Sequence, residues 1–244
     1  MKLIGSAFRT PFFFGKMNNV AINTRLIRYL SEFVTPERLD TFDEVLNYRT
    51  NYLTVLLEDL YQPHNASAVL RSCDCFGIQN VHIIENRNSY SVNPDVALGS
   101  NKWLTLIKYN QGEYNTIDAY QILKREGYRI VATVPHNDAT NLDEFVLKGG
   151  KSALVFGTEL EGLSKNAIQE ADEYLRIPMF GFTGSFNISV SAAIILYQLT
   201  SQLRSSNIRW QLTSIEKEEL KLEWLKRTIK KSDLLIREFL EKEK

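Results

Sequence analysis

LVFGTELEGLS at residues 154–164, then a short segment that we expect to be helical, then YLRIPMF at 174–180 and GFTGSFNISVSAAIILYQL at 181–199 follow one another toward the C-terminal end of the chain. Two short apolar segments, Leu154–Phe156 and Tyr174–Ile177, each run into a loop rich in glycine and small polar residues. Strand-to-loop switches of this kind lie at the carboxyl edge of a parallel sheet, where α/β proteins bind their ligands. The stretch therefore predicts an α/β fold with a binding site at that edge.

The two loops carry different polar groups. The first places Glu159 and Glu161 between two glycines, and carboxylates are expensive to bury unless a cation or a hydrogen-bond donor meets them. The second leads through Ser185 to Asn187, both good N-cap residue types for a long helix that we expect to start near Asn187. A helix N-terminus offers unpaired N–H groups to an anion or a polar ligand. Taken alone, each loop could also be an ordinary turn between a strand and a helix, without a binding site.

Upstream, short apolar runs alternate with amphipathic segments. The alternation predicts a parallel sheet with helices on both faces. We expect strands at 53–57, 81–84, 104–108 and 129–134, and helices at 66–76, at 116–126 with Asn115 as its cap, and briefly from Pro94 to Gly99.

The flanks read as helical. Residues 19–34 and a segment starting at Pro36 have apolar residues at helical spacing, and arginines decorate them. We expect an extension at 1–18 outside the folded part, with Met17 as a candidate start, a helical arm at 19–49, an α/β domain at 50–205 and one amphipathic C-terminal helix at 206–244. That helix must cover either the sheet of its own chain or a second subunit. The arginines form a solvated face or a basic arm for phosphates, with Arg25, Arg28 and Arg49 as weak candidate RNA contacts beside Arg38.

Composition limits the classes of protein. The chain has 244 residues, 44% of them apolar, with 29 basic and 29 acidic side chains, which is a globular composition without a bulk nucleic-acid signature. A local basic face would still suffice for RNA. No apolar run is long enough for a membrane span, and no signal peptide is evident. Cys73 and Cys75 would point about 200° apart on a helix, so we interpret both as buried residues of a cytoplasmic, reducing compartment.

Several chemistries lack their motifs. The sequence has no P-loop, no dinucleotide-binding glycine motif after the first strand and no nucleophile elbow, and its three histidines have no metal-ligand spacing. The remaining candidates are loop residues on one sheet edge: Asn65 and Arg71 after the first strand, Glu159 after a later one, and Ser185 with Asn187. Arg71 is either a surface salt bridge or an anion clamp, because its planar fork binds phosphate bidentately.

Three motifs in order resemble a known family. PHNASAVLRSCDCFGIQNVHII at 63–84, LVFGTELEGLS and IPMFGFTGSFNISVSAAIILYQ are similar to the motifs of the SpoU (TrmH-type) ribose 2′-O-methyltransferases of the SPOUT superfamily. ALGSNKWL at 97–104 resembles a further family segment, and the likeness covers about residues 50–200. The helices that lead into LNYRTNYLTVLLEDLYQPHN resemble the tRNA (guanosine-2′-O-)-methyltransferase branch more than the rRNA branch.

This resemblance implies a parallel sheet whose C-terminal part forms a deep trefoil knot, an exception to the rules for chain connections. It implies S-adenosylmethionine as methyl donor, S-adenosylhomocysteine as product, no metal, and a homodimer. The donor would be held by backbone groups at Thr133, Val134, Gly157, Ile177, Met179, Ser185 and Phe186. Phe186 departs from the family, in which the position is usually leucine.

The resemblance also implies roles for the loop residues. Arg71 matches the central arginine of the family, and a phosphate clamp that stabilises the developing alkoxide is the easier role for a guanidinium that rarely loses its proton. Asn65 would orient Arg71 or the ribose, and Glu159 would anchor the knot loops or a neighbouring arginine. Ser185 and Asn187 would cap the helix and hold the donor loop.

The expected activity is methyl transfer to a ribose 2′-hydroxyl of RNA, with the D-loop guanosine of tRNA as the target. The alternative enzyme is an rRNA 2′-O-methyltransferase. Two other classes stay open at this point: a non-catalytic knotted RNA-binding protein, and a nucleotide-binding α/β sensor with a dimerising helical tail.

Overall fold

The computed structural model describes residues 16–89, 99–135, 138–158 and 161–243. These residues divide into two compact units. One comprises Asn47–Leu212, and the other combines the N-terminal helices up to Leu46 with the helices after Thr213. No helix in the described ranges is both long and apolar enough to cross a membrane.

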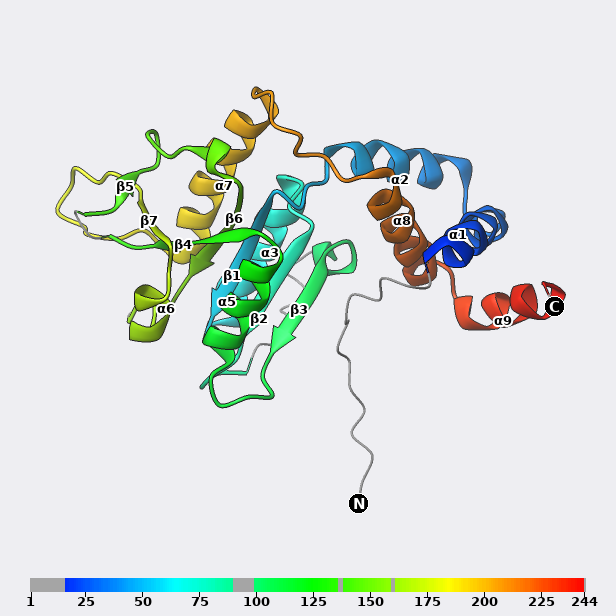
Figure 1. The fold of residues 1–244 in the computed structure, drawn as a ribbon, viewed down its shortest axis with the longest axis horizontal. Coiled ribbons are helices and arrows are strands. Elements are labelled where there is room, and N and C mark those ends of the chain that lie inside the picture. Colours follow the sequence, from blue (N-terminus) through cyan, green and yellow to red (C-terminus); the bar gives the residue numbers. More distant parts are fainter. Residues whose placement is uncertain (1–15, 90–98, 136–137, 159–160, 244) are drawn as a thin grey trace, which may run out of the picture. The chain divides into compact units, whose positions relative to one another are not determined.

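The larger unit is built on a parallel sheet, as the sequence predicted (Figure 1). In the described chain the sheet has the order β3-β2-β1-β6-β4-β7-β5, and every neighbouring pair is parallel. β6 therefore returns between two strands that precede it, β1 and β4. The strands are β1 Leu53–Glu58, β2 Asn80–Ile84, β3 Thr105–Tyr109, β4 Tyr128–Thr133, β5 Thr140–Asn141, β6 Lys151–Phe156 and β7 Glu173–Arg176.

Helices cover both faces of the sheet. Val55 and Leu57 of β1 pack into one apolar cluster with residues of α3 (Pro63–Cys75) and α7 (Ile188–Arg204). Leu56, between them, faces a second cluster with residues of α5 (Asn115–Arg125) and α6 (Lys165–Gln169). Because both of its faces are covered, all of β1 is buried, which is why it reads as a continuous apolar run. Two short 3₁₀ helices, η1 Ser100–Lys102 and η2 Leu147–Gly149, complete this unit.

Several predicted boundaries need correction. α3 starts at Pro63 rather than at residue 66, because proline suits the first turn of a helix, so Asn65 lies inside that turn. Asn115 is the first residue of α5 rather than its cap, and its side chain instead accepts from the N–H of Gly112 at 2.9 Å. The two-residue strand β5 was not predicted. The helix expected from Pro94 to Gly99 lies outside the described residues, apart from Gly99.

The smaller unit contains α1 Lys16–Ser31, α2 Pro36–Tyr48 up to Leu46, α8 Ser214–Thr228 and α9 Ser232–Lys242. The start of α2 at Pro36 confirms the prediction. The single helix expected at 206–244 is wrong: Lys231 has a φ of 60°, a left-handed conformation that a continuous right-handed helix excludes, and two helices result. Of the extension expected at 1–18, residues 1–15 lie outside the described chain and 16–18 belong to α1.

The apolar stripe of the C-terminal helices covers the N-terminal helices. Trp224 of α8 packs its ring edge against Phe42 of α2, with centroids 5.4 Å apart. Phe239 of α9 lies 5.5 Å from Tyr29 of α1. Thr213 and Glu216 form a capping box that starts α8. The apolar stripe is therefore buried within the smaller unit of its own chain. The N-terminal helices were not among the predicted partners of this stripe.

Candidate active site

The order of the strands gathers the expected donor residues at one edge. β6, β4 and β7 are consecutive in the sheet, so Gly157, Val134 and Ile177, which follow these strands, come at neighbouring strand ends about 5 Å apart. Thr133 donates its hydroxyl to the carbonyl of Val155 at 2.7 Å, and the N–H of Val134 donates to Leu175 at 3.0 Å. The main-chain N–H of Val134 is thus already engaged.

The loop after β6 closes on itself around two glycines. The N–H of Thr158 donates to the carbonyl of Gly162 at 2.9 Å, and the N–H of Gly162 donates back at 3.1 Å. A Cβ on Gly157 would lie 2.2 Å from that Gly162 carbonyl oxygen, and Gly162 itself has a φ of 69°. Both positions therefore require glycine for this turn. Glu159, the expected anchor, lies outside the described residues.

The first and the last predicted site loops meet directly. Asn187 is the N-cap of α7, as expected, and its Oδ1 accepts from the N–H of Ser189 at 2.9 Å. Its Nδ2 donates to Oδ1 of Asn65 at 3.2 Å. Asn65 is only 5% exposed and donates in turn to the side chain of Gln62 at 2.9 Å. The hydrogen bond between the two asparagines joins the first turn of α3 to the start of α7.

Arg71 lies on α3 with its side chain exposed. It lies six positions after Asn65, so the two side chains point to different faces of the helix. Among the described residues, no hydrogen bond or ion pair engages its guanidinium. The alternative that Arg71 forms a surface salt bridge therefore has no support among the described residues. Its guanidinium is available to bind an anion from outside the chain.

The loop that leads into α7 is exposed. Ile177 and Met179 are half-buried, whereas Ser185 and Phe186 are exposed. Phe180 is 97% exposed, and the ring of Phe182 is fully open to solvent. Exposed aromatic rings on one loop are typical of a surface that binds a ligand or another macromolecule.

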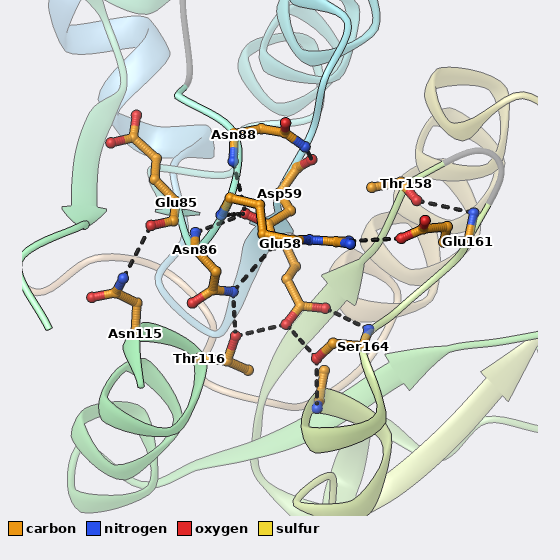
Figure 2. Close-up of polar contacts among 12 residues, drawn as sticks. Glu58, Asp59, Glu85, Asn86, Asn88, Asn115, Thr116, Thr158, Glu161 and Ser164 are labelled. Carbon is orange, nitrogen blue, oxygen red and sulfur yellow. Dashed lines mark hydrogen bonds and ion pairs between the residues drawn. The ribbon is translucent and has the colours of Figure 1, made fainter. Parts of the chain in front are cut away.

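A polar cluster that was not predicted from the sequence lies at the end of β1 (Figure 2). Asp59 has a φ of 53°, and its buried Oδ1 accepts from the backbone N–H groups of Asn86 at 2.7 Å and Arg87 at 2.9 Å. Arg87 also donates to the carboxylate of Glu161 at 2.7 Å. The cluster thus ties the loop after β2 to the loop after β6. The only signal for it in the sequence is an acidic pair at the end of an apolar strand.

Glu58 forms the buried half of the same cluster. It is 2% exposed, and its carboxylate accepts from Thr116 at 2.6 Å and from the hydroxyl and N–H of Ser164 at 2.8 and 2.9 Å. Ser164 is the N-cap of α6 and accepts from the N–H of Ala167 at 3.1 Å. Figure 2 shows the Glu58 carboxylate between Thr116 and Ser164.

The expected RNA contacts have different surroundings. Arg49 is 1% exposed and donates to Asp74 and to the carbonyl of Ile78, so its assignment as an RNA contact is wrong: its charge is used inside the fold. Arg25 and Arg28 are exposed on α1, and Arg25 pairs with Glu243 at 2.6 Å.

Two further titratable groups are buried. Burial lowers the pKa of His82 to about 4, and its Nδ1 lies 3.0 Å from the hydroxyl of Tyr109. Burial also raises the pKa of the Cys73 thiol, whereas Cys75 is exposed because the helix turns it to the opposite side. The expectation that Cys75 is buried is therefore wrong. In the described ranges, no group of three histidine, cysteine or acidic side chains could hold a metal.

Solved structures identify the class of this fold as that of the RNA methyltransferases. A tRNA modifying enzyme, TrmH/SpoU of Aquifex aeolicus, aligns with a TM-score of 0.71 and 29% identity over 80% of this chain and 98% of that one. AviRb, a SpoU methyltransferase of Streptomyces viridochromogenes solved with S-adenosylmethionine, shares the fold with a TM-score of 0.55, 23% identity, and 67% and 62% of the chains covered. The sequence profile of the SpoU rRNA Methylase family matches residues 52–197. This chain belongs to that family.

Relatives extend the likeness beyond the matched domain. A protein of Borreliella burgdorferi is 44% identical over 204 residues, which are 84% of this chain and 91% of that protein. One of Thermus thermophilus is 36% identical over 168 residues, 69% of this chain and 84% of that protein. Both bear the name tRNA (guanosine(18)-2′-O)-methyltransferase.

Proposed function

We propose that this protein transfers a methyl group from S-adenosylmethionine to the ribose 2′-hydroxyl of guanosine 18 in the D-loop of tRNA. The observation that carries the proposal is the 44% identity over 84% of the chain to a relative named for this reaction. The exposed Arg71, on the helix that follows β1, supports the chemistry.

The reaction forms a bond between the 2′-oxygen and the methyl carbon, breaks the bond between that carbon and the sulfonium sulfur, and releases the hydroxyl proton. The donor supplies an already activated methyl group and leaves as S-adenosylhomocysteine. The protein must therefore align the two reactants and manage one proton. Arg71 holds a substrate phosphate and stabilises the oxygen as it gains negative charge, because a guanidinium stays protonated and binds anions bidentately.

The hydrogen bond between Asn65 and Asn187 holds in place the two elements that would align the reactants. Because Asn187 donates to Asn65, the helix that carries Arg71 and the loop that leads into α7 keep a constant spacing. Ser185 lies two residues before this bond and contributes to the same loop. Glu159 anchors the loop after β6 in this proposal.

The residues at the sheet edge fit the donor in two ways. The turn around Gly157 leaves no room for a Cβ, so the backbone itself forms the wall of the site. Val134 offers its carbonyl, since its N–H donates to Leu175. The proposed donor contacts are backbone groups of Thr133, Val134, Gly157, Ile177, Met179, Ser185 and Phe186.

The proposal includes a deep trefoil knot in the C-terminal part of the larger unit. The support for it is the path of the chain: β6 is inserted between β1 and β4, and β7 then lies beside β4. This strand order is consistent with a knot, which is an exception to the usual rules for chain connections.

A homodimer in the cytoplasm completes the proposal. Val190 and Tyr197 are exposed large apolar residues seven positions apart, so they share one face of α7, and the exposed Phe186 lies in the loop just before this helix. Ala192, a small residue of the same helix, is buried in the core of its own chain and is not part of that face. Arg25 and Arg28 of α1 are proposed to contact the tRNA backbone.

The test is methyl transfer from labelled S-adenosylmethionine to unmodified total tRNA and, separately, to rRNA, followed by nuclease mapping. A tRNA transcript in which guanosine 18 is replaced by adenosine is the matched control. Label at guanosine 18, lost in the control, supports the proposal. Label only in rRNA would favour the rRNA enzyme, and donor binding without label in either RNA would favour the non-catalytic protein. Sedimentation velocity of the pure protein tests the dimer.

A further inference from the structure

We propose that Glu58 is a positioning residue that fixes Ser164 at the end of the loop after β6, whose turn Thr158 and Gly162 close, and that it thereby sets the affinity for the methyl donor. The inference rests on the proposed function, because this loop is one wall of the proposed donor site. It assigns a role to a carboxylate that has no part in the proposed methyl transfer itself.

The register of the sheet brings Glu58 to the loop. Leu57 of β1 pairs with Phe156 of β6, so the next residues, Glu58 and Gly157, leave the sheet side by side. Glu58 is buried to 2% exposure at this point. Its carboxylate reaches across the loop to its last residue, Ser164, and spans the turn that Gly157 opens.

The hydrogen bonds around Glu58 have only one consistent set of directions. Ser164 Oγ accepts from the N–H of Ala167, so its proton goes to Glu58 Oε1. Thr116 Oγ1 accepts from the side chain of Asn86, so its proton also goes to Oε1. The N–H of Ser164 donates to Oε2. Both oxygens of Glu58 must therefore accept, which only a carboxylate can do.

No cation compensates this carboxylate among the described residues. Burying a carboxylate that only neutral donors contact lowers the stability of the fold, and an apolar side chain at the end of β1 would be more stable. What the carboxylate provides is a fixed position for Ser164 at one end of the loop. The close packing of Gly157 against Gly162 fixes the other end. A loop held at both ends before the donor arrives loses less entropy on binding.

A second link to the same loop serves as the control. Arg87 bonds to Glu161, but both side chains are more than 60% exposed, so water and salt screen the pair. If any link to the loop mattered equally, removal of Arg87 would weaken donor binding as much as a change at Glu58.

The experiment measures donor affinity by calorimetry, together with kcat and the KM for donor and tRNA, in the full-length protein. Glu58→Gln keeps the shape but turns an amide donor toward the N–H of Ser164. It is expected to raise the donor Kd about tenfold, because one hydrogen bond to a charged group is lost. The kcat at saturating donor and the KM for tRNA should stay within about threefold. Ser164→Ala should raise the donor Kd by a smaller factor, and Arg87→Ala by less than twofold.

Each outcome decides the inference. An unchanged donor Kd in folded Glu58→Gln, even with a lowered melting temperature, would show a structural role only and overturn it. If that variant does not fold, Ser164→Ala takes its place, and an unchanged donor Kd in Ser164→Ala overturns the inference in the same way. Equal weakening by Arg87→Ala would also contradict it. Donor binding by the wild type without methyl transfer to tRNA would sink the proposed function alone, and the donor Kd values would still decide the role of Glu58.

Discussion

The substitution Gly157→Ala tests the loop after β6 most directly. The added Cβ would lie 2.2 Å from the carbonyl oxygen of Gly162 and 2.4 Å from the N of Leu163, whereas real Cβ contacts essentially never fall under 3.0 Å. The backbone at Gly162 must therefore move by at least about 0.8 Å. Both contacts are with main-chain atoms, so no side chain can rotate away.

The magnitude follows from two effects. Overpacking of a tight site costs about 1 to 3 kcal/mol. The two hydrogen bonds between Thr158 and Gly162 are strained by the same shift, and each contributes about 0.5 to 1.5 kcal/mol when well formed. We expect the free energy of unfolding to fall by about 2 to 4 kcal/mol. We also expect the donor Kd to rise by at least about tenfold, since the wall of the donor site moves.

Urea denaturation and calorimetric titration with S-adenosylmethionine measure the two quantities. Gly112→Ala is the matched control, because the only contact of its Cβ below 3.0 Å would be with the flexible carboxylate of Asp118, at 2.9 Å, which can move away. We expect the control to change stability by less than about 1 kcal/mol and to leave donor binding unchanged. Wild-type stability and wild-type donor affinity in Gly157→Ala would refute the steric argument and the place of this loop in the donor site.

Three further predictions concern single side chains. Arg71→Ala should lower kcat by about 100-fold or more while the donor Kd stays within about twofold; a lost donor affinity with intact turnover at saturation would contradict its role. The folded pKa of His82, about 4, lies below the unfolded value of 6.5, so the unfolded chain binds more protons and stability falls as the pH falls from 6.5 toward 4. Between pH 7 and pH 5, protonation of His82 in the unfolded chain should lower the free energy of unfolding by about 2 kcal/mol. Denaturation at both pH values should show this loss in the wild type and not in His82→Gln. An equal pH dependence in both proteins would exclude His82 as the cause. Arg49→Met should lower stability by about 3 kcal/mol, at the low end for a broken buried pair because Asp74 stays partly in water, and tRNA affinity measured by gel shift should not change. A tRNA affinity that falls without a loss of stability would restore Arg49 as an RNA contact.

Local rules carried much of the prediction. The strands β1, β2, β4 and β6 were found because apolar, β-branched runs mark buried parallel strands. The start of α2 at Pro36 and the cap of α7 at Asn187 were found because caps depend on a few adjacent residues. The two-residue strand β5 escaped because so short a segment has no period of its own.

Charged residues were harder to place. Arg49 and Arg28 look alike in a sequence, yet one is buried against Asp74 and the other is exposed. The break between α8 and α9 was missed because Lys231, a residue that rarely takes a left-handed φ, gives no signal of a turn.

Local patterns in the sequence predict the longer strands, the glycine loops and the cap of α7, because these depend on contacts within a few positions. The position of β6 between β1 and β4 is visible only in the folded chain. That order brings Ser164 to Glu58 across 106 positions and Asn187 to Asn65 across 122. Such pairings depend on the path of the whole chain through the sheet, which no local pattern records, and they join the separate loops into one site.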